Sequence, residues 1–280
     1  MSEVASFFRG TWTIALYTWR EGMRKKIIVA FLILSILSIV GSFFLTAFLS
    51  QTTGSGMEVD MQAKQIKDIG VAVISIFGVL ITIFISASVV PNEVENKVVY
   101  TVLSKPVRRF QYLLGKFTGA QLIIILNLVI MGGLFFIAVY MKENIMPTLL
   151  LWSVLLTYFE FLIVSAFTFA LSCAATSAVL PTIGGLFIYV TGNLTEYLKD
   201  VSERAGQTEL WLDKMTGQIS KALFYILPNL QNFSLRHQII HLAPNDPPRD
   251  ILLPNLIVYG LSFALAGYLI SYVVFFRKEL

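Results

Sequence analysis

The feature that most constrains the fold is a set of six long apolar runs. A helix needs about 20 predominantly apolar residues to cross a bilayer. The runs are Ile27–Ser50, Ile69–Val90, Phe117–Tyr140, Thr148–Ser172, Ala178–Leu194 and Ile251–Phe276. We therefore predict an all-α polytopic membrane protein with six transmembrane helices. The first run is too long for the apolar core of a secretory signal and lacks a small-residue cleavage site, so we expect it to be a membrane anchor.

Composition excludes the soluble alternatives. Hydrophobic residues make up 56% of the chain and charged residues only 14%, a balance that fits neither a soluble globular domain nor a disordered chain. The net charge of +4 would suit nucleic acid if the cations gathered on one face. The positions of the cations along the chain instead indicate that the positive charge reflects membrane topology.

Lysine and arginine in the short segments beside the spans predict the orientation, because cytoplasmic segments carry an excess of them. With both termini in the cytoplasm, twelve of these cations fall inside and three fall in short outer loops. The outer loop of residues 195–250 is near the length at which charge no longer steers topology. We therefore predict cytoplasmic termini, and we expect no nucleic-acid partner.

Residues 1–26 are expected to form an amphipathic helix before the first span. One face carries Phe8, Trp12, Ala15, Leu16 and Trp19 at helical spacing, while the cations lie mostly on the other side. Aromatic rings enter the acyl boundary and cations meet anionic head groups, so this pattern predicts a helix lying along the inner leaflet of the bilayer. A solvated leader is the alternative.

The loop of residues 91–116 is the one sizeable cytoplasmic loop. Pro91 suits the first turn of a helix, and Glu93 and Glu95 favour its positive N-terminal end. Pro106 ends such a helix, because it restricts the residue before it to an extended conformation. The pattern predicts a short amphipathic helix parallel to the membrane, which can dock in a groove on a soluble partner.

The same loop resembles the signature between the second and third spans of type-2 ABC transporter permeases. The matching residues are Glu93, Glu95, Thr101, Leu103, Ser104, Pro106, Val107, Arg109, Gly115 and Lys116. The wider family commonly has Gly-Thr where this chain has Tyr100-Thr101. That departure points to a subgroup that includes the permease of the nitrous oxide reductase maturation system. The span count, the N-terminal helix and the large last outer loop are similar as well.

The resemblance implies that residues 27–280 form a permease domain whose cytoplasmic loop inserts into a cleft of a separate ATP-hydrolysing subunit. The contact residues implied are Glu93, Glu95, Val98, Thr101, Leu103, Ser104, Pro106 and Arg109. It also implies two ATPase subunits, a second permease copy or paralogue, a bacterial inner membrane, and export or extracytoplasmic maturation. Ala174 and Thr176, between the fourth and fifth spans, would make a second cytoplasmic contact, although close helix packing explains small residues there equally well.

The chain itself is not expected to hydrolyse ATP. A phosphate-binding loop needs GxxxxGK[ST], whereas Gly115-Lys116 is followed by Phe117 and lacks the upstream glycine. We therefore expect this chain to bind no cofactor, with ATP and Mg²⁺ on the partner ATPase. The single cysteine, Cys173, provides neither a disulfide framework nor a multi-cysteine metal site.

Glu160 lies midway along the fourth predicted span. A carboxylate at that depth costs about 2.5–3.5 kcal/mol on insertion scales, so it should face protein or water. It could belong to a translocation path, a subunit seam or a proton-sensitive site, or it could be a packing contact with Asn127 as a partner. In the fifth span, Gly184-Gly185 predicts close packing against a neighbouring helix.

The outer loop contains both histidines of the chain, His237 and His241, on a helix expected from Asn232 to Leu242. Their i, i+4 spacing can present two imidazoles to one metal, but Gln238 stands where the zinc-protease pattern needs Glu, so a polar helix face is favoured. Two other functions stay open. One is an intramembrane enzyme using Glu160 and these histidines, and the other is a membrane scaffold or sensor without transport.

Overall fold

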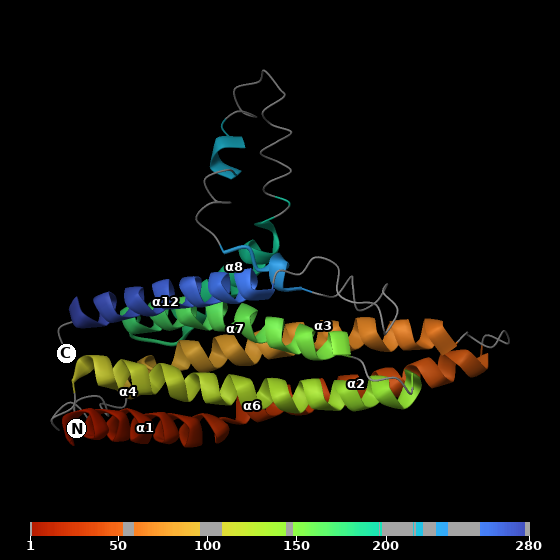
Figure 1. Ribbon diagram of the computed structural model, residues 1–280, viewed down its shortest axis with the longest axis horizontal. Coiled ribbons are helices and arrows are strands. Elements are labelled where there is room, and N and C mark those ends of the chain that lie inside the picture. Colours follow the sequence, from red (N-terminus) through yellow and green to blue (C-terminus); the bar gives the residue numbers. More distant parts are fainter. Residues whose placement is uncertain are drawn as a thin grey trace.

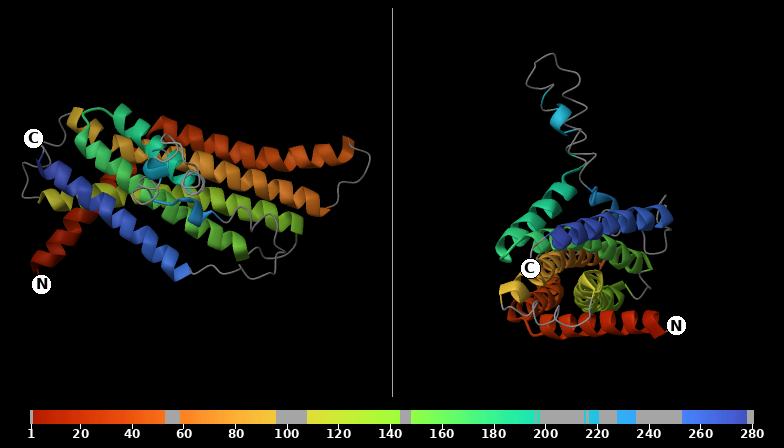
Figure 2. Two further views of the ribbon diagram at one scale, coloured as in Figure 1. Left: turned by 90° about the horizontal axis from the view of Figure 1, so that it is seen from above. Right: turned by 90° about the vertical axis from the view of Figure 1, so that its left-hand side faces the viewer.

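The computed structural model describes residues 2–52, 59–95, 108–143, 148–195, 197, 215, 217–220, 228–234 and 253–277. These residues are helical apart from short turns and links, and no strand occurs among them. Several of the long helices run side by side roughly along one axis (Figure 1), while the first and last helices are inclined to it (Figure 2). The all-α prediction is therefore confirmed for the part of the chain that is described.

The apolar runs predicted to span the membrane all coincide with helices. The elements are α1 (Ser2–Met23), α2 (Lys26–Thr52), α3 (Val59–Ser88), α4 (Pro91–Glu95), α6 (Arg109–Glu143), α7 (Thr148–Ala174), α8 (Val179–Asn193), the 3₁₀ turn η1 (Gln231–Phe233) and α12 (Leu253–Arg277). The start of α1 and the end of α12 lie at the same end of the bundle (Figure 1), which we call the proximal end. The opposite end is called distal.

Four of these helices are long and apolar enough to cross a membrane by themselves. They are Lys64–Glu95, Arg109–Met141, Leu149–Ala174 and Pro254–Arg277. A fifth span is added if Phe7–Met23 and Lys26–Ser42, which meet at 65°, count as one broken span. The helix Val179–Asn193 is apolar but shorter. Its 15 residues extend about 22 Å, against a hydrocarbon core of about 30 Å, so the count of six spans remains a prediction.

Helix α1 crosses the proximal end of the bundle and packs against α6. In the right-hand view of Figure 2, where the bundle is seen nearly end-on, α1 runs across it. Phe8 and Trp12 are 65% and 54% exposed, as expected for rings that meet lipid, whereas Ala15 is fully buried. The predicted apolar face is therefore divided, because one side of it packs on protein and the other side carries the exposed aromatic rings.

Small residues allow the helices to approach closely. A β-carbon at Gly267 of α12 would lie 2.9 Å from the β-carbon of Ala166 in α7, and one at Gly185 of α8 would lie 2.5 Å from Oγ1 of Thr168. Helices in a bilayer associate by this kind of close packing, because lipid is as apolar as their side chains. The packing role predicted for Gly184-Gly185 is confirmed at Gly185.

The segment of residues 228–234 makes hydrogen bonds to both α8 and α12. The Leu230 N–H donates to the Gly192 carbonyl at 3.1 Å, and the Asn229 N–H donates to the Tyr259 hydroxyl at 2.9 Å. Beyond η1, Ser234 is extended, with φ −83° and ψ 111°. The helix expected from Asn232 to Leu242 is therefore wrong at Ser234, because the backbone leaves the helical region there, and residues 235–242 lie outside the described residues.

Candidate functional site

The proximal end brings together the described parts of the cytoplasmic loop. Helix α3 ends at Ser88, the turn Val89-Val90 follows, and α4 begins at Pro91, as the sequence predicts for its first turn. The N–H groups of Glu93 and Val94 both donate to the Val90 carbonyl at 3.1 Å. These bonds start α4 directly at the turn that follows α3.

The Glu93 side chain turns into the protein. It is 3% exposed, and its two carboxylate oxygens have different partners on α6. The Lys116 ammonium donates to Oε1 in a buried ion pair, and the Tyr112 hydroxyl donates to Oε2. Both oxygens of the carboxylate are therefore bonded to the same helix.

Residues Tyr112 and Lys116 reach one carboxylate because they are four residues apart on α6, which places them on one face. Lys116 is 1% exposed, so the pair is almost completely desolvated. A desolvated ion pair contributes little net stability, but removing one partner leaves an unpaired buried charge. The arrangement consequently holds the two helices in one specific register.

Two more elements complete this group. The Lys116 ammonium lies 5.3 Å from the ring centroid of Tyr17 in α1, within the range of cation–π attraction. The Tyr112 ring stacks on Phe275 of α12 at 5.7 Å. We call Glu93, Tyr112, Lys116 and Tyr17 the Glu93 cluster. It joins the base of α4 to α6 and α1.

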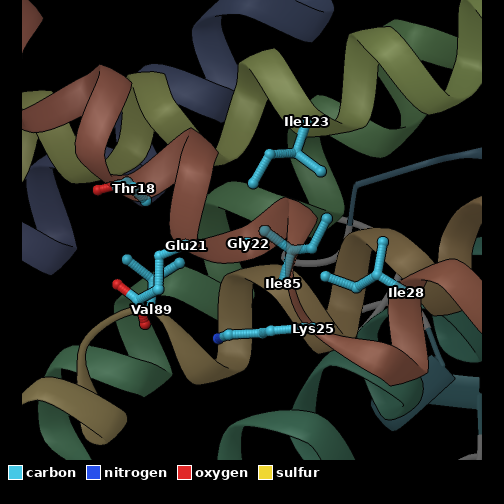
Figure 3. A pocket seen from close by; sticks show the side chains of 8 residues that line it. All are labelled: Thr18, Glu21, Gly22, Lys25, Ile28, Ile85, Val89 and Ile123. Atoms are coloured by element: carbon cyan, nitrogen blue, oxygen red, sulfur yellow. The ribbon is translucent and has the colours of Figure 1, made fainter.

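A second contact lies beside this cluster, at the bend between α1 and α2. The Lys25 ammonium donates to the Ser88 hydroxyl at 2.7 Å, at the last residue of α3. The bend encloses a cavity of about 10 Å³, the space that one water molecule needs. Its lining side chains, shown in Figure 3, are Thr18, Glu21, Gly22, Lys25, Ile28, Ile85, Val89 and Ile123.

Burial lowers the pKa of Lys25. The Lys116 ammonium lowers it further, while Glu21 and Glu93 oppose the shift because their negative charges favour the ammonium form. The two cations and two carboxylates of this region therefore form one electrostatic unit across α1, α4 and α6.

The other described residues of the predicted contact differ in their surroundings. Glu95 is exposed, two residues beyond the buried Glu93. Arg109, at the first residue of α6, donates to the Phe276 carbonyl at 3.2 Å and lies 5.8 Å from the centre of that ring. Ala174 and Thr176 are exposed where α7 ends. Val98, Thr101, Leu103, Ser104 and Pro106 lie outside the described residues.

Glu160 is buried on α7 at 5% exposure. The Asn193 amide, at the last residue of α8, lies 3.4 Å from its Oε1. The partner suggested from the sequence, Asn127, instead donates to the Ile123 carbonyl of its own helix at 2.8 Å. Glu160 therefore lies at the contact between α7 and α8.

The described residues contain no group of three or more His, Cys, Asp or Glu that could hold a metal ion. His237 and His241 lie outside them. The described site at the proximal end is a joint between helices, because Glu93, Lys116 and Lys25 bind partners within the chain. The i, i+4 spacing of Tyr112 and Lys116 is the sequence signal that could have identified Tyr112 as a partner of Glu93. No local signal identifies Ser88 as the partner of Lys25.

Comparison with known families shows which family the chain resembles over most of its length. The model of a family described as ABC-2 family transporter protein matches residues 12–280, which is nearly the whole chain. No curated protein matches significantly. The match includes α1 from Trp12 onward, all the long helices and the segment around η1.

Proposed function

Because the chain belongs to the ABC-2 family of transporter proteins, we propose that it couples ATP hydrolysis on a separate cytosolic ATPase to export of a substrate or to extracytoplasmic maturation. Membership makes the chain the multi-pass membrane component of an ABC transporter, the subunit that does not bind nucleotide. ATP and Mg²⁺ then bind to the partner ATPase, and this chain needs no cofactor of its own.

The assembly we propose has two ATPase subunits beneath two permeases, the second being a copy or a paralogue of this chain. The bilayer is the bacterial inner membrane, all six apolar helices cross it, and the proximal end faces the cytoplasm. The sequence supports this orientation, since twelve lysines and arginines fall in the segments predicted to be cytoplasmic, against three in the short segments predicted to be outside. The Tyr100-Thr101 pair supports placement in the subgroup of the nitrous oxide reductase maturation permease.

The observation that carries the coupling proposal is the position of α4. It leaves α3 directly at the proximal end, and Glu95 at its end is exposed. The segment that follows contains Leu103 and the rest of the family signature. Ala174 and Thr176 are exposed on the neighbouring link, so they suit a second contact. A cytosolic subunit docked on this end would meet both segments at once.

The proposal is tested by affinity purification of the tagged protein from its host membrane in mild detergent. We expect a cytosolic protein that carries a GxxxxGK[ST] loop to co-purify. Leu103→Glu should reduce capture of this ATPase at least tenfold, because it places a charge in the middle of the cytoplasmic loop of residues 91–116, which we propose to be the docking segment.

The control is Met141→Ser, at an exposed position near the distal end of α6. It should leave capture unchanged. If wild-type protein captures no such ATPase, or if Leu103→Glu captures as much as wild type, the coupling proposal is wrong.

A further inference from the structure

We infer that Glu93 is a positioning residue that faces inward and does not touch the ATPase. It joins α4, at the start of the cytoplasmic loop of residues 91–116, to α6 and α1, and it transmits motion from that loop to these helices. This inference rests on the proposed function. It concerns the route by which movement at the docking surface reaches the membrane helices. The Glu93 cluster and the Lys25–Ser88 contact carry it.

The two glutamates of α4 provide the first step. Glu95 is exposed, whereas Glu93 is 3% exposed and has both oxygens bonded to α6. A docked subunit could reach Glu93 only by displacing Lys116 and Tyr112, which would leave a buried ammonium without its counter-charge. Docking to α4 therefore uses its exposed side and leaves the inner carboxylate in place.

The second step concerns what Glu93 holds. Its partners Tyr112 and Lys116 lie within the first eight residues of α6, a helix that continues to Glu143. The same ammonium faces the Tyr17 ring of α1. A displacement of α4 would therefore act on the first turns of the long helix α6 and on α1, which crosses it.

The third step is that the α3–α4 turn is held on both sides. Before the turn, Lys25 binds Ser88, and after it, Lys116 binds Glu93. The bend between α1 and α2, the end of α3 and the start of α6 are thereby fastened to the same short segment. Because these contacts are short polar bonds at buried or partly buried sites, the segment moves with its neighbours instead of sliding past them.

The test follows hydrogen–deuterium exchange in the purified complex of permease and ATPase, with and without ADP–vanadate to trap the nucleotide-bound state. In wild type, trapping should change exchange in peptides of the docking segment and in peptides of α1 and early α6. Glu93→Gln keeps the shape of the side chain but removes its charge. It should retain capture of the ATPase within twofold and lower the nucleotide-dependent change in α1 and α6 at least fivefold.

Three comparisons separate transmission from folding and docking. Glu95→Gln, on the same helix, should weaken capture while the captured complex still transmits the change. The charge exchange Glu93→Lys with Lys116→Glu should restore transmission, and Tyr112→Phe, which keeps the ring on Phe275, should lower it about twofold. Gly133→Ala, in open space on α6, should change neither readout.

Each outcome supports or overturns the inference. Unchanged transmission in Glu93→Gln would overturn it. Loss of capture in Glu93→Gln, with exchange in the nucleotide-free protein unaltered, would show that Glu93 touches the ATPase and would also overturn it. Absence of any ATPase with wild-type protein would instead refute the proposed function, on which this inference depends. If Glu93→Gln does not fold, the charge exchange and Tyr112→Phe decide the question.

Discussion

Glu93 and Glu95 have the same side chain on the same short helix, yet their surroundings differ. One carboxylate is buried between an ammonium and a phenol, and the other is exposed. A buried charge is tolerated only when it is paired and hydrogen-bonded. The free energy of unfolding therefore depends on the presence of both Glu93 and Lys116.

Lys116→Met should destabilise the protein by about 3–5 kcal/mol, because it leaves the Glu93 carboxylate buried and unpaired. Combining Lys116→Met with Glu93→Gln should recover part of that loss, because the double variant buries no unpaired charge. The unfolding midpoint in detergent, measured for each variant, checks this. A double variant as unstable as the sum of the two single variants would contradict it.

Lys25 gives the protein a pH-dependent stability. Its pKa in the folded protein is lowered by burial from the ordinary value of 10.5. Between the lowered pKa and 10.5 the unfolded chain binds more protons than the folded chain, so stability from this group rises with pH across that window. Below the lowered pKa, the cost of holding the ammonium in the bend is fully present.

Lys25→Met removes this titration. The stability of wild type relative to Lys25→Met should therefore rise with pH between the lowered pKa and 10.5. Melting temperatures of both proteins, measured in the same buffers, provide the comparison, since other titrating groups cancel. A difference that stays flat or falls with pH would refute the assignment.

Glu160 is expected to act as a contact between α7 and α8. Glu160→Gln keeps an oxygen facing the Asn193 amide, so stability should be unchanged, whereas Glu160→Leu removes the acceptor and should cost about 1–3 kcal/mol. Thermal unfolding measures this, and ATPase activity of the complex is recorded beside it. A Glu160→Gln variant that is stable but inactive would favour a translocation or proton-sensitive role instead.

At the scale of elements, the crossing of α1 over α6 depends on glycine for space. A β-carbon at Gly119 would lie 2.6 Å from the Ala15 carbonyl oxygen, and one at Gly115 would lie 2.8 Å from the Thr11 carbonyl oxygen. These obstacles are backbone atoms, which cannot rotate away as side chains do. The glycines therefore determine how close α1 lies to the Glu93 cluster.

Gly119→Ala should destabilise the protein by about 1–3 kcal/mol, because the added methyl group forces α1 away from α6. Gly133→Ala makes the same change on the same helix at a position with nothing within 4 Å, and it should be neutral. Melting temperatures of the two variants measure the effect. Equal stability of the two variants would contradict the close crossing.

At the scale of the whole molecule, large apolar side chains remain exposed along several helices. On α8 these are Val179, Leu180, Ile183, Leu186, Phe187 and Val190. Soluble proteins rarely expose contiguous surfaces of this kind, whereas lipid or a second permease can cover them. The short α8 is the element on which the span count depends, because five crossings without it would place the two termini on opposite sides.

Six spans place both termini on one side of the membrane, and the distribution of lysine and arginine predicts that this side is the cytoplasm. A fluorescent protein that matures only in the cytoplasm, fused to the N-terminus in one protein and to the C-terminus in another, should fluoresce in both. A fusion that lies on the outer side of the membrane would stay dark. Fluorescence from only one terminus would indicate an odd number of crossings and would refute the six-span arrangement.

Much of the fold was predictable from local patterns. The positions of the long helices follow from apolar runs, and the start of α4 at Pro91 follows from the geometry of proline. These features depend on neighbours within a few turns of the chain. The Tyr112 and Lys116 pair was within reach of the same reasoning, since i, i+4 residues share a helix face.

The sequence by itself determined the class of the protein, because hydropathy and charge position act through the bilayer and need no tertiary contact. Only the tertiary structure decided that Glu93 faces inward while Glu95 is exposed, that Lys25 binds Ser88, and that Glu160 meets Asn193 rather than Asn127. These pairs join residues far apart in the chain. Their partners depend on which helix faces which, and that is fixed by packing among helices.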